Sequence, residues 1–298
     1  MSAMSQGTVV LFPQGVESCT ARVVHVQPAE GTHLSEGTNL FVVTDRTPFH
    51  PVDHTWPDQP GDEGTLSAGG RSLRVVDALT AASGPDGVLR VGAEIPVRRN
   101  EPGWSFLVAH VVEAPGDMPA SELAGAEVTL AVDSARRRAL SMAHTGCHLM
   151  SLALNGRLRD LWKKLPRTDC LGNPDFDQVA IVESRIMPMQ SVDRYRLGKS
   201  LRRAGFDVAA LTDALESVRE DVEERLGRWI EAGGRVTIET EAPELASRRW
   251  WTCELPEGPA RIPCGGTHLG NLGELASLAV RFEIGEQELV VHTTAKQA

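Results

Sequence analysis

The sequence predicts an α+β protein with a small N-terminal β-barrel domain, residues 1–133, and a second domain of helices packed on an antiparallel sheet, residues 134–298. Three observations lead to this prediction. A length of 298 residues is typical of two domains. Short β-branched runs fill the first half of the chain, and helical spacing of apolar residues begins only after Val132.

Seven strands are predicted in the first half. Each is a short run of apolar and β-branched residues, and glycine, proline, aspartate or serine stands between most of them. The predicted strands are residues 8–12, 22–26, 40–44, 73–76, 88–91, 106–112 and 128–132. This rhythm is typical of a small barrel or sandwich.

Two helices and four strands are predicted in the second half. The first helix runs from about residue 135 to about residue 164, because Asp133 or Ser134 can cap its start and no proline intervenes. The second begins after Asp207, where apolar side chains recur every three or four residues, and ends at a glycine pair. The predicted strands are residues 179–186, 235–240, 278–284 and 288–293.

Composition excludes several classes of protein. With 41% hydrophobic residues the chain can build a core in each domain, so it is neither disordered nor fibrous. No apolar run approaches the roughly 18 residues of a membrane span, and the N-terminus lacks the pattern of a signal peptide. We therefore expect a cytoplasmic protein with no membrane partner and no obligate protein partner. Its five widely spaced cysteines suit reduced thiols or metal ligands better than disulfides.

Charge is divided unevenly along the chain. Residues 1–135 contain 7 Lys and Arg against 17 Asp and Glu, whereas residues 136–298 contain 23 of each. A polyanionic partner should therefore meet the basic clusters of the second half, although any one such cluster is more typical of a solvated surface. The clusters are Arg136, Arg137 and Arg138; Lys163, Lys164 and Arg167; Lys199, Arg202 and Arg203; and Arg248 with Arg249.

Two short motifs carry candidate metal ligands. His144 and His148 stand four residues apart in the first predicted helix, so both imidazoles project from one face. Cys264 and His268 flank a turn that two glycines allow to bend tightly. Three imidazoles and one thiolate suit Zn²⁺. The alternative is a pair of unrelated features, a helix with two histidines and a glycine-rich hairpin with a buried cysteine.

A zincin protease is disfavoured by one residue. That chemistry requires a glutamate directly after the first histidine as the general base, and here Thr145 occupies the position.

These motifs, with two others, resemble the AlaX family, the free-standing relatives of the editing domain of alanyl-tRNA synthetase, which is also related to the editing domain of threonyl-tRNA synthetase. The H-T-x-x-H-L of residues 144–149 and the C-G-G-T-H of residues 264–268 stand in the family's order. Residues 47–51 and 59–66, T-P-F-H-P and Q-P-G-D-E-G-T-L, resemble its N-terminal loop. Residues 270–284 resemble the strand that follows the C-G-G-T-H turn. The resemblance covers the chain from about residue 20 to about residue 290.

The resemblance implies a stand-alone (trans) editing hydrolase. Its reaction is hydrolysis of the ester that joins an amino acid to the 3′-terminal adenosine of a wrongly charged tRNA, and the acceptor end of aminoacyl-tRNA is its partner. In this reading residues 134–298 form a zinc-binding catalytic editing domain. The chemistry of the residues agrees, because ester hydrolysis at neutral pH needs an activated water and a stabilised oxyanion, and zinc can supply both or can position the substrate.

Further residues are candidates for the site. Thr145 and Thr267 each adjoin a ligand and could orient water or substrate through a hydroxyl, or else serve only in packing. Gln59 and Asp62 are candidate contacts from the N-terminal loop. The basic clusters of the second half are expected to follow acceptor-stem phosphates.

The substrate is expected to carry a small hydroxy amino acid. Serine on an alanine tRNA is one possibility, and a threonine-like residue is another, because an offshoot of the family is a fluorothreonyl-tRNA deacylase. One departure leaves this choice open: where the family has a glycine-rich G-G-G before Q-P, residues 52–58 are longer and bulkier. The alternative is a lengthened surface loop without catalytic consequence. His54 in this loop is expected to be solvated, and Cys147 is expected to be a small buried residue.

Two other functions remain open at this stage. A tRNA- or partner-binding module with a structural zinc is favoured by the full set of four protein ligands, because catalytic zinc sites keep an open position. A hydrolase for small esters or amides would need no tRNA.

Overall fold

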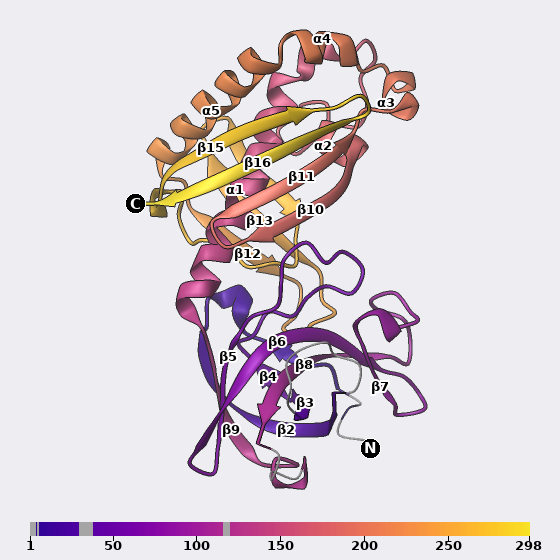
Figure 1. Cartoon of the computed structure of the whole chain (residues 1–298), viewed down its shortest axis with the longest axis vertical. Helices are drawn as coiled ribbons and strands as arrows, with labels where there is room; N and C mark the ends of the chain where they lie inside the picture. The colour runs from indigo at the N-terminus through magenta and orange to yellow at the C-terminus, as the bar shows by residue number, and fades with distance from the viewer. Residues whose placement is uncertain (1–3, 5, 30–37, 116–119) are drawn as a thin grey trace. The chain divides into compact units, whose positions relative to one another are not determined.

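The computed structural model describes residues 4, 6–29, 38–115 and 120–298. Its contacts divide the chain into two compact units (Figure 1). Unit 1 comprises Met1–Arg137 with Glu239–Arg249, and unit 2 comprises Arg138–Ile238 with Trp250–Ala298. The expected domain boundary at residue 133 stays a prediction about separately folding domains.

Unit 1 is built around a closed barrel of six antiparallel strands. In order around the barrel these are β5 (Gly64–Ala68), β9 (Glu127–Val132), β2 (Ser18–Pro28), β3 (Thr38–Thr44), β8 (Ser105–Ala114) and β6 (Arg71–Ser83), and β6 pairs with β5 to close it. Strand β7 (Leu89–Val91) extends β6, and β1 (Val9–Val10) pairs with β4 (Arg46–Thr47). The predicted barrel is confirmed.

The barrel encloses one hydrophobic core. Leu66, Val75, Val108 and Leu130 are fully buried within it. At Gly64 a Cβ atom would lie 2.1 Å from the carbonyl oxygen of Ala131, so the close pairing of β5 with β9 requires glycine there.

Residues Glu239–Arg249 have their contacts in unit 1, although they follow the first part of unit 2 in the sequence. The backbone N–H of Val10 donates to the carbonyl of Pro243 at 2.9 Å. Arg249 is buried, and its guanidinium lies 5.3 Å from the ring centroid of Phe12. Arg249 therefore anchors this segment, which corrects the expectation that it faces phosphates.

Unit 2 contains an antiparallel sheet of four strands in the order β10 (Ile181–Met187), β11 (Gln190–Arg196), β16 (Glu288–Gln297) and β15 (Leu275–Ile284). The long helices α1 (Ser134–Arg157) and α5 (Leu215–Ala232) share a hydrophobic core with it. A smaller sheet consists of β12 (Val236–Thr240), β13 (Arg249–Leu255) and β14 (Gly258–Pro263). The predicted packing of helices on an antiparallel sheet is confirmed.

Short helices complete unit 2: α2 (Phe176–Ala180), α3 (Lys199–Arg203) and α4 (Val208–Asp213). Asp207 caps α4 by accepting the N–H of Ala210, and Gly233 ends α5 in the left-handed region at φ 66°. Both ends match the prediction, but the single predicted helix is divided at Ala214. The first predicted helix also ends earlier than expected, at Arg157, where a 3-10 turn (Arg159–Leu161) follows.

Helix α1 lies close against the sheet of unit 2. Met142, Leu149 and Met150 are fully buried on it. At Gly146 a Cβ atom would lie 2.8 Å from the side chain of Leu278 on β15, so this glycine allows the close approach. Among the described residues, no helix combines the length and apolar character that crossing a membrane requires.

Two carboxyl groups are buried between α2 and β11. The hydroxyl of Tyr195 donates to Asp177 at 2.9 Å, and the hydroxyl of Ser184 donates to Asp193 at 2.6 Å. Burial raises the pKa of Asp177 to about 7 and the pKa of Asp193 to about 6, because the charged forms lose their hydration.

We predict that the stability of the Asp177→Asn variant, compared with that of the native protein, increases as the pH rises. Because folding raises the pKa of Asp177, its protonated form stabilises the folded state below the unfolded pKa, and this contribution is lost as the pH rises through about 7. Between pH 5.5 and 8.5 the unfolding free energy of the variant should gain about 1 to 2 kcal/mol relative to the native protein. Urea titrations measure this difference, with the exposed Asp213→Asn as control. Parallel pH profiles for Asp177→Asn and the native protein would contradict the prediction.

Candidate metal centre

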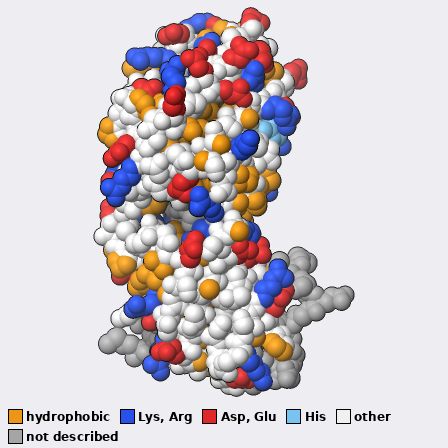
Figure 2. All heavy atoms as spheres, turned by 90° about the vertical axis from the view of Figure 1, so that its left-hand side faces the viewer, with side chains coloured by type: hydrophobic (Ala, Val, Ile, Leu, Met, Phe, Trp, Pro, Cys, Tyr) orange, Lys and Arg blue, Asp and Glu red, His pale blue; other side chains and the backbone are white. Residues whose placement is uncertain are grey.

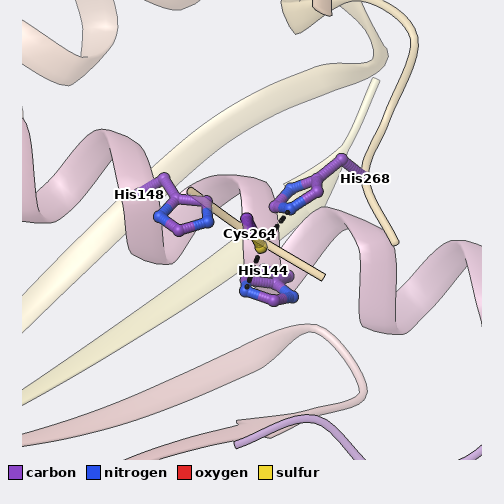
Figure 3. Close-up of side chains that lie close together, drawn as sticks. All are labelled: His144, His148, Cys264 and His268. Carbon is purple, nitrogen blue, oxygen red and sulfur yellow. Dashed lines mark hydrogen bonds between the residues drawn. The ribbon is translucent and has the colours of Figure 1, made fainter. Parts of the chain in front are cut away.

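Four side chains from two parts of unit 2 converge on one point (Figure 3). His144 and His148 lie one turn apart on α1, Cys264 directly follows β14, and His268 lies in the loop after it. Their candidate ligand atoms all lie within 4.8 Å of one another. The cluster could hold a metal ion.

The distances within the cluster agree with those around a single ion. The Sγ atom of Cys264 lies 3.5 Å from Nε2 of His144 and 3.2 Å from Nε2 of His268, as Figure 3 marks. Zinc bonds of about 2.3 Å to sulfur and about 2.0 Å to nitrogen, at tetrahedral angles, separate the two donors by about 3.5 Å. The donor set and its spacing therefore fit Zn²⁺.

His148 supplies independent support for a metal ion at the cluster. Its Nε2 is buried, and in the described part of the chain it has no hydrogen-bond partner. Burial lowers the pKa of His148 to about 4, so the ring stays neutral and keeps a lone pair. The ring centroid of Trp251 lies 5.1 Å from that of His148, so the indole covers one side of the imidazole with apolar surface. A buried nitrogen without a partner is costly, and a metal ion at the cluster would satisfy it.

Backbone and hydroxyl groups position the ligands. The N–H of Gly266 donates to Sγ of Cys264 at 3.4 Å, which favours the thiolate. The hydroxyl oxygen of Thr145 accepts the N–H of Leu269 at 3.2 Å and lies 3.2 Å from Nδ1 of His268. Since a coordinating Nε2 carries no proton, Nδ1–H would donate to Thr145 and fix the orientation of the ring.

A second hydroxyl pair holds the Cys264–His268 loop against α1. Ser141 donates to the hydroxyl of Thr267 at 2.9 Å, and both side chains are buried. These contacts give Thr145 and Thr267 positioning roles, while their expected action on water or substrate stays a prediction. Ser141 is not among the predicted site residues, although helical spacing sets it three residues before His144 on the same face.

Cys147 points away from the cluster of ligands. Its Sγ donates to the carboxyl of Asp193 at 3.4 Å, and burial raises its pKa well above the usual value. The thiol is thus a protonated, hydrogen-bonded group next to β11.

The candidate residues of the N-terminal loop lie in unit 1. Asp62 is buried and forms an ion pair with Arg137, whose Nε donates to it at 2.8 Å. Asp62 also accepts the backbone N–H of His50 at 2.5 Å. These contacts give Asp62 a structural role, and its expected contact with substrate stays a prediction. Gln59 is buried as well, and its contact with substrate stays a prediction.

The three arginines at the start of α1 have different surroundings, and the expected phosphate contacts of Arg136 and Arg138 stay a prediction. Arg137 is buried against Asp62 and the carbonyl of Pro48, which corrects the expectation that it contacts RNA. Arg136 pairs with Glu63 at 2.9 Å, and Arg138 pairs with Glu274 at 3.0 Å. The other predicted basic residues are exposed: Lys163, Lys164, Arg167, Lys199, Arg202, Arg203 and Arg248.

His54 is not solvated as expected. Its side chain is 3% exposed, and neither ring nitrogen has a hydrogen-bond partner within the described ranges. The neighbouring Asp53 pairs with Arg99, so this loop of unit 1 is tied down by charge.

No family model matches this chain, but several curated proteins align with much of it. The alanine–tRNA ligase of Anaeromyxobacter sp. (strain Fw109-5) is 27% identical over 284 residues, which cover 93% of this chain and 25% of the ligase. That of Pyrobaculum neutrophilum is 28% identical over 248 residues, 81% of this chain and 22% of the ligase. That of Akkermansia muciniphila is 30% identical over 141 residues, 47% of this chain and 11% of the ligase.

The chain thus spans about a quarter or less of the length of these curated relatives. The matches and the four motifs agree on one relationship. This protein is therefore similar to part of the alanine–tRNA ligases over most of its own length, which supports the AlaX-like resemblance of its motifs.

Proposed function

We propose that the protein is an aminoacyl-tRNA deacylase that acts in trans. In the reaction, water adds to the ester carbonyl, the bond to the 3′-terminal ribose oxygen breaks, and the products are a free amino acid and an uncharged tRNA. The observation that carries the proposal is the convergence of His144, His148, Cys264 and His268 within 4.8 Å, in a chain that aligns over most of its length with alanine–tRNA ligases.

The metal of the site is proposed to be Zn²⁺, held by these three imidazoles and one thiolate. When bound, it supplies Lewis-acid chemistry for ester hydrolysis, by activating water or by holding the substrate. The chain's own groups prepare the site: Gly266 stabilises the thiolate, Thr145 orients His268, and Trp251 covers His148 with apolar surface.

The substrate is proposed to carry a small hydroxy amino acid, serine or a threonine-like residue. Editing exists because one binding pocket discriminates poorly between similar small amino acids, so a second site must remove the errors. The enlarged loop at residues 52–58 is the part of the sequence that departs from the family, and it supports a substrate other than the usual one.

A second candidate is a tRNA-binding module whose metal is structural. Its support is the complete set of four protein ligands, since a catalytic zinc usually keeps one open position.

The test is deacylation of charged tRNAs by the purified protein. The panel contains Ser-tRNA and Gly-tRNA for alanine, with Ser-tRNA, Thr-tRNA and fluorothreonyl-tRNA for threonine. We expect hydrolysis of one hydroxy amino acid ester, lost with a chelator and restored by Zn²⁺. Hydrolysis of no member by the zinc-loaded protein would favour the binding module.

We predict that Thr145→Val weakens zinc binding about 10- to 100-fold, because it removes the oxygen that accepts Nδ1–H of His268. Thr145→Ser keeps the hydroxyl and should bind zinc nearly as tightly as the native protein. Competition with a chromophoric chelator measures both affinities. Native affinity in Thr145→Val together with weakened affinity in Thr145→Ser would show that packing of the methyl group matters rather than the hydroxyl.

A further inference from the structure

Two basic clusters that are distant in the sequence lie side by side in unit 2. Trp162 and Phe206 form an antiparallel bridge, and the N–H of Lys163 donates to the carbonyl of Gly205 at 2.8 Å. Gly205 has φ +104°, and a Cβ atom there would lie 3.0 Å from the backbone nitrogen of Lys164. This close approach sets the lysine pair next to the end of α3, at one end of unit 2 (Figure 1).

We name these side chains the α3 basic surface. All six are exposed, and they come from the segment after α1 and from α3: Arg159, Lys163, Lys164, Lys199, Arg202 and Arg203. Lys163 pairs with Asp207 at 2.9 Å. The other five have no ion pair with any residue that the structure describes. One edge of the surface is a hollow of mixed charge, in which Asp207, Asp213 and Glu286 lie with two of its cations, Lys163 and Arg202.

Cations elsewhere in unit 2 are mostly neutralised. On α5, Arg219 and Arg228 pair with Glu216 and Glu224 one turn away, and on β15 Arg281 pairs with Glu283. Figure 2 shows the result on one face, where blue cationic and red anionic side chains lie intermixed over the upper part. The α3 basic surface is therefore a local concentration of unpaired positive charge, which suits a polyanion.

The length of α1 beyond the metal centre is similar to the length of a tRNA acceptor end. Helix α1 continues for nine residues from His148 to Arg157, about 14 Å at 1.5 Å each, and the chain then enters the segment with Arg159, Lys163 and Lys164. Four unpaired nucleotides of a stacked 3′ end span about 14 Å at about 3.4 Å each. An ester at the cluster of ligands would thus place the first duplex phosphates near the α3 basic surface.

We propose that the α3 basic surface binds the acceptor-stem phosphates of the tRNA whose ester lies at the metal centre. The proposal rests on the proposed function for the identity of the nucleic acid. Contacts to phosphates carry no sequence information, so they strengthen binding of charged and uncharged tRNA alike. The surface acts on affinity and leaves the chemical step unchanged.

The test is the charge reversal Lys164→Glu with Arg203→Glu. We expect the Kd for uncharged tRNA to rise roughly 10- to 100-fold, and the slope of log Kd against log salt concentration to fall by about 2. Hydrolysis of a short aminoacyl-adenosine ester, which cannot reach the surface, should keep its rate. The matched control reverses two exposed arginines elsewhere in unit 2, Arg228→Glu with Arg235→Glu, and changes the net charge equally.

Unchanged tRNA affinity in the Lys164 and Arg203 variant would overturn the proposal, and so would an equal loss in the control. If the native protein hydrolyses no ester, the proposed function fails, but the tRNA affinities still decide whether this surface binds RNA. A loss of affinity that is equal for tRNA and for an acidic polypeptide would also overturn it, because the surface would then not be fitted to phosphates.

Discussion

Cys264→Ala is expected to lower aminoacyl ester hydrolysis by roughly 1,000-fold or more, while tRNA affinity and the fold are retained. The Sγ atom of Cys264 lies 3.5 Å from Nε2 of His144 and 3.2 Å from Nε2 of His268. The substitution therefore removes one of the four proposed metal ligands. Loss of a group that merely orients a ligand costs 10- to 100-fold in metal affinity, and loss of a ligand itself costs more. The remaining histidines are held by α1 and by Thr145, which keeps the surroundings folded.

Three measurements on one preparation check this prediction. Bound zinc is quantified by elemental analysis, deacylation is followed on the preferred charged tRNA, and near-UV circular dichroism reports tertiary packing. Cys170→Ala, an exposed cysteine away from the cluster, is the matched control and should behave as the native protein. Unfolding of Cys264→Ala together with zinc loss would instead favour the structural-zinc module.

Arg137→Ala is expected to destabilise unit 1 by about 3 to 5 kcal/mol, because it leaves the carboxylate of Asp62 buried without its counter-ion. Arg137 donates to Asp62 through two nitrogens and to the carbonyl of Pro48 through one of them. Removing one partner of such a pair costs far more than removing both, since replacement by apolar groups of similar volume avoids the stranded charge.

Urea unfolding of the barrel, followed by tryptophan fluorescence, measures the change. The double variant Arg137→Met with Asp62→Leu should recover much of the loss, and the exposed Arg46→Ala should cost less than about 0.5 kcal/mol. A stable Arg137→Ala protein with weakened tRNA affinity would restore the original expectation that this arginine contacts phosphates.

The barrel could be predicted because most of its strands combine β-branched residues with turn residues at their ends. Strand β5 escaped prediction because Leu66 is its only large apolar residue, and its place in the barrel depends on pairing with β6 and β9. Strand β11 escaped for a different reason. Its inward side chains include Ser191 and Asp193, whose burial is made possible by hydrogen bonds that no local pattern reveals.

The four candidate ligands could be predicted because each pair is local, one helical turn or one tight loop. The triplet at the start of α1 shows where such reasoning stops. Successive helical residues point about 100° apart, so one of the three arginines must turn inward. Which one does so depends on Asp62, far away in the sequence, and the residue letters alone contain no sign of that pairing.

Because Glu239–Arg249 belongs to unit 1, unit 1 cannot complete its folding early in synthesis. A ribosome that has completed the barrel strands has not yet supplied the segment whose backbone pairs with Val10 and whose Arg249 covers Phe12. Unit 1 therefore reaches its final structure only after most of unit 2 has been synthesised. A fragment ending at Arg137 would lack this segment, so an isolated unit 1 should join Met1–Arg137 to Glu239–Arg249 rather than result from cutting the chain in half.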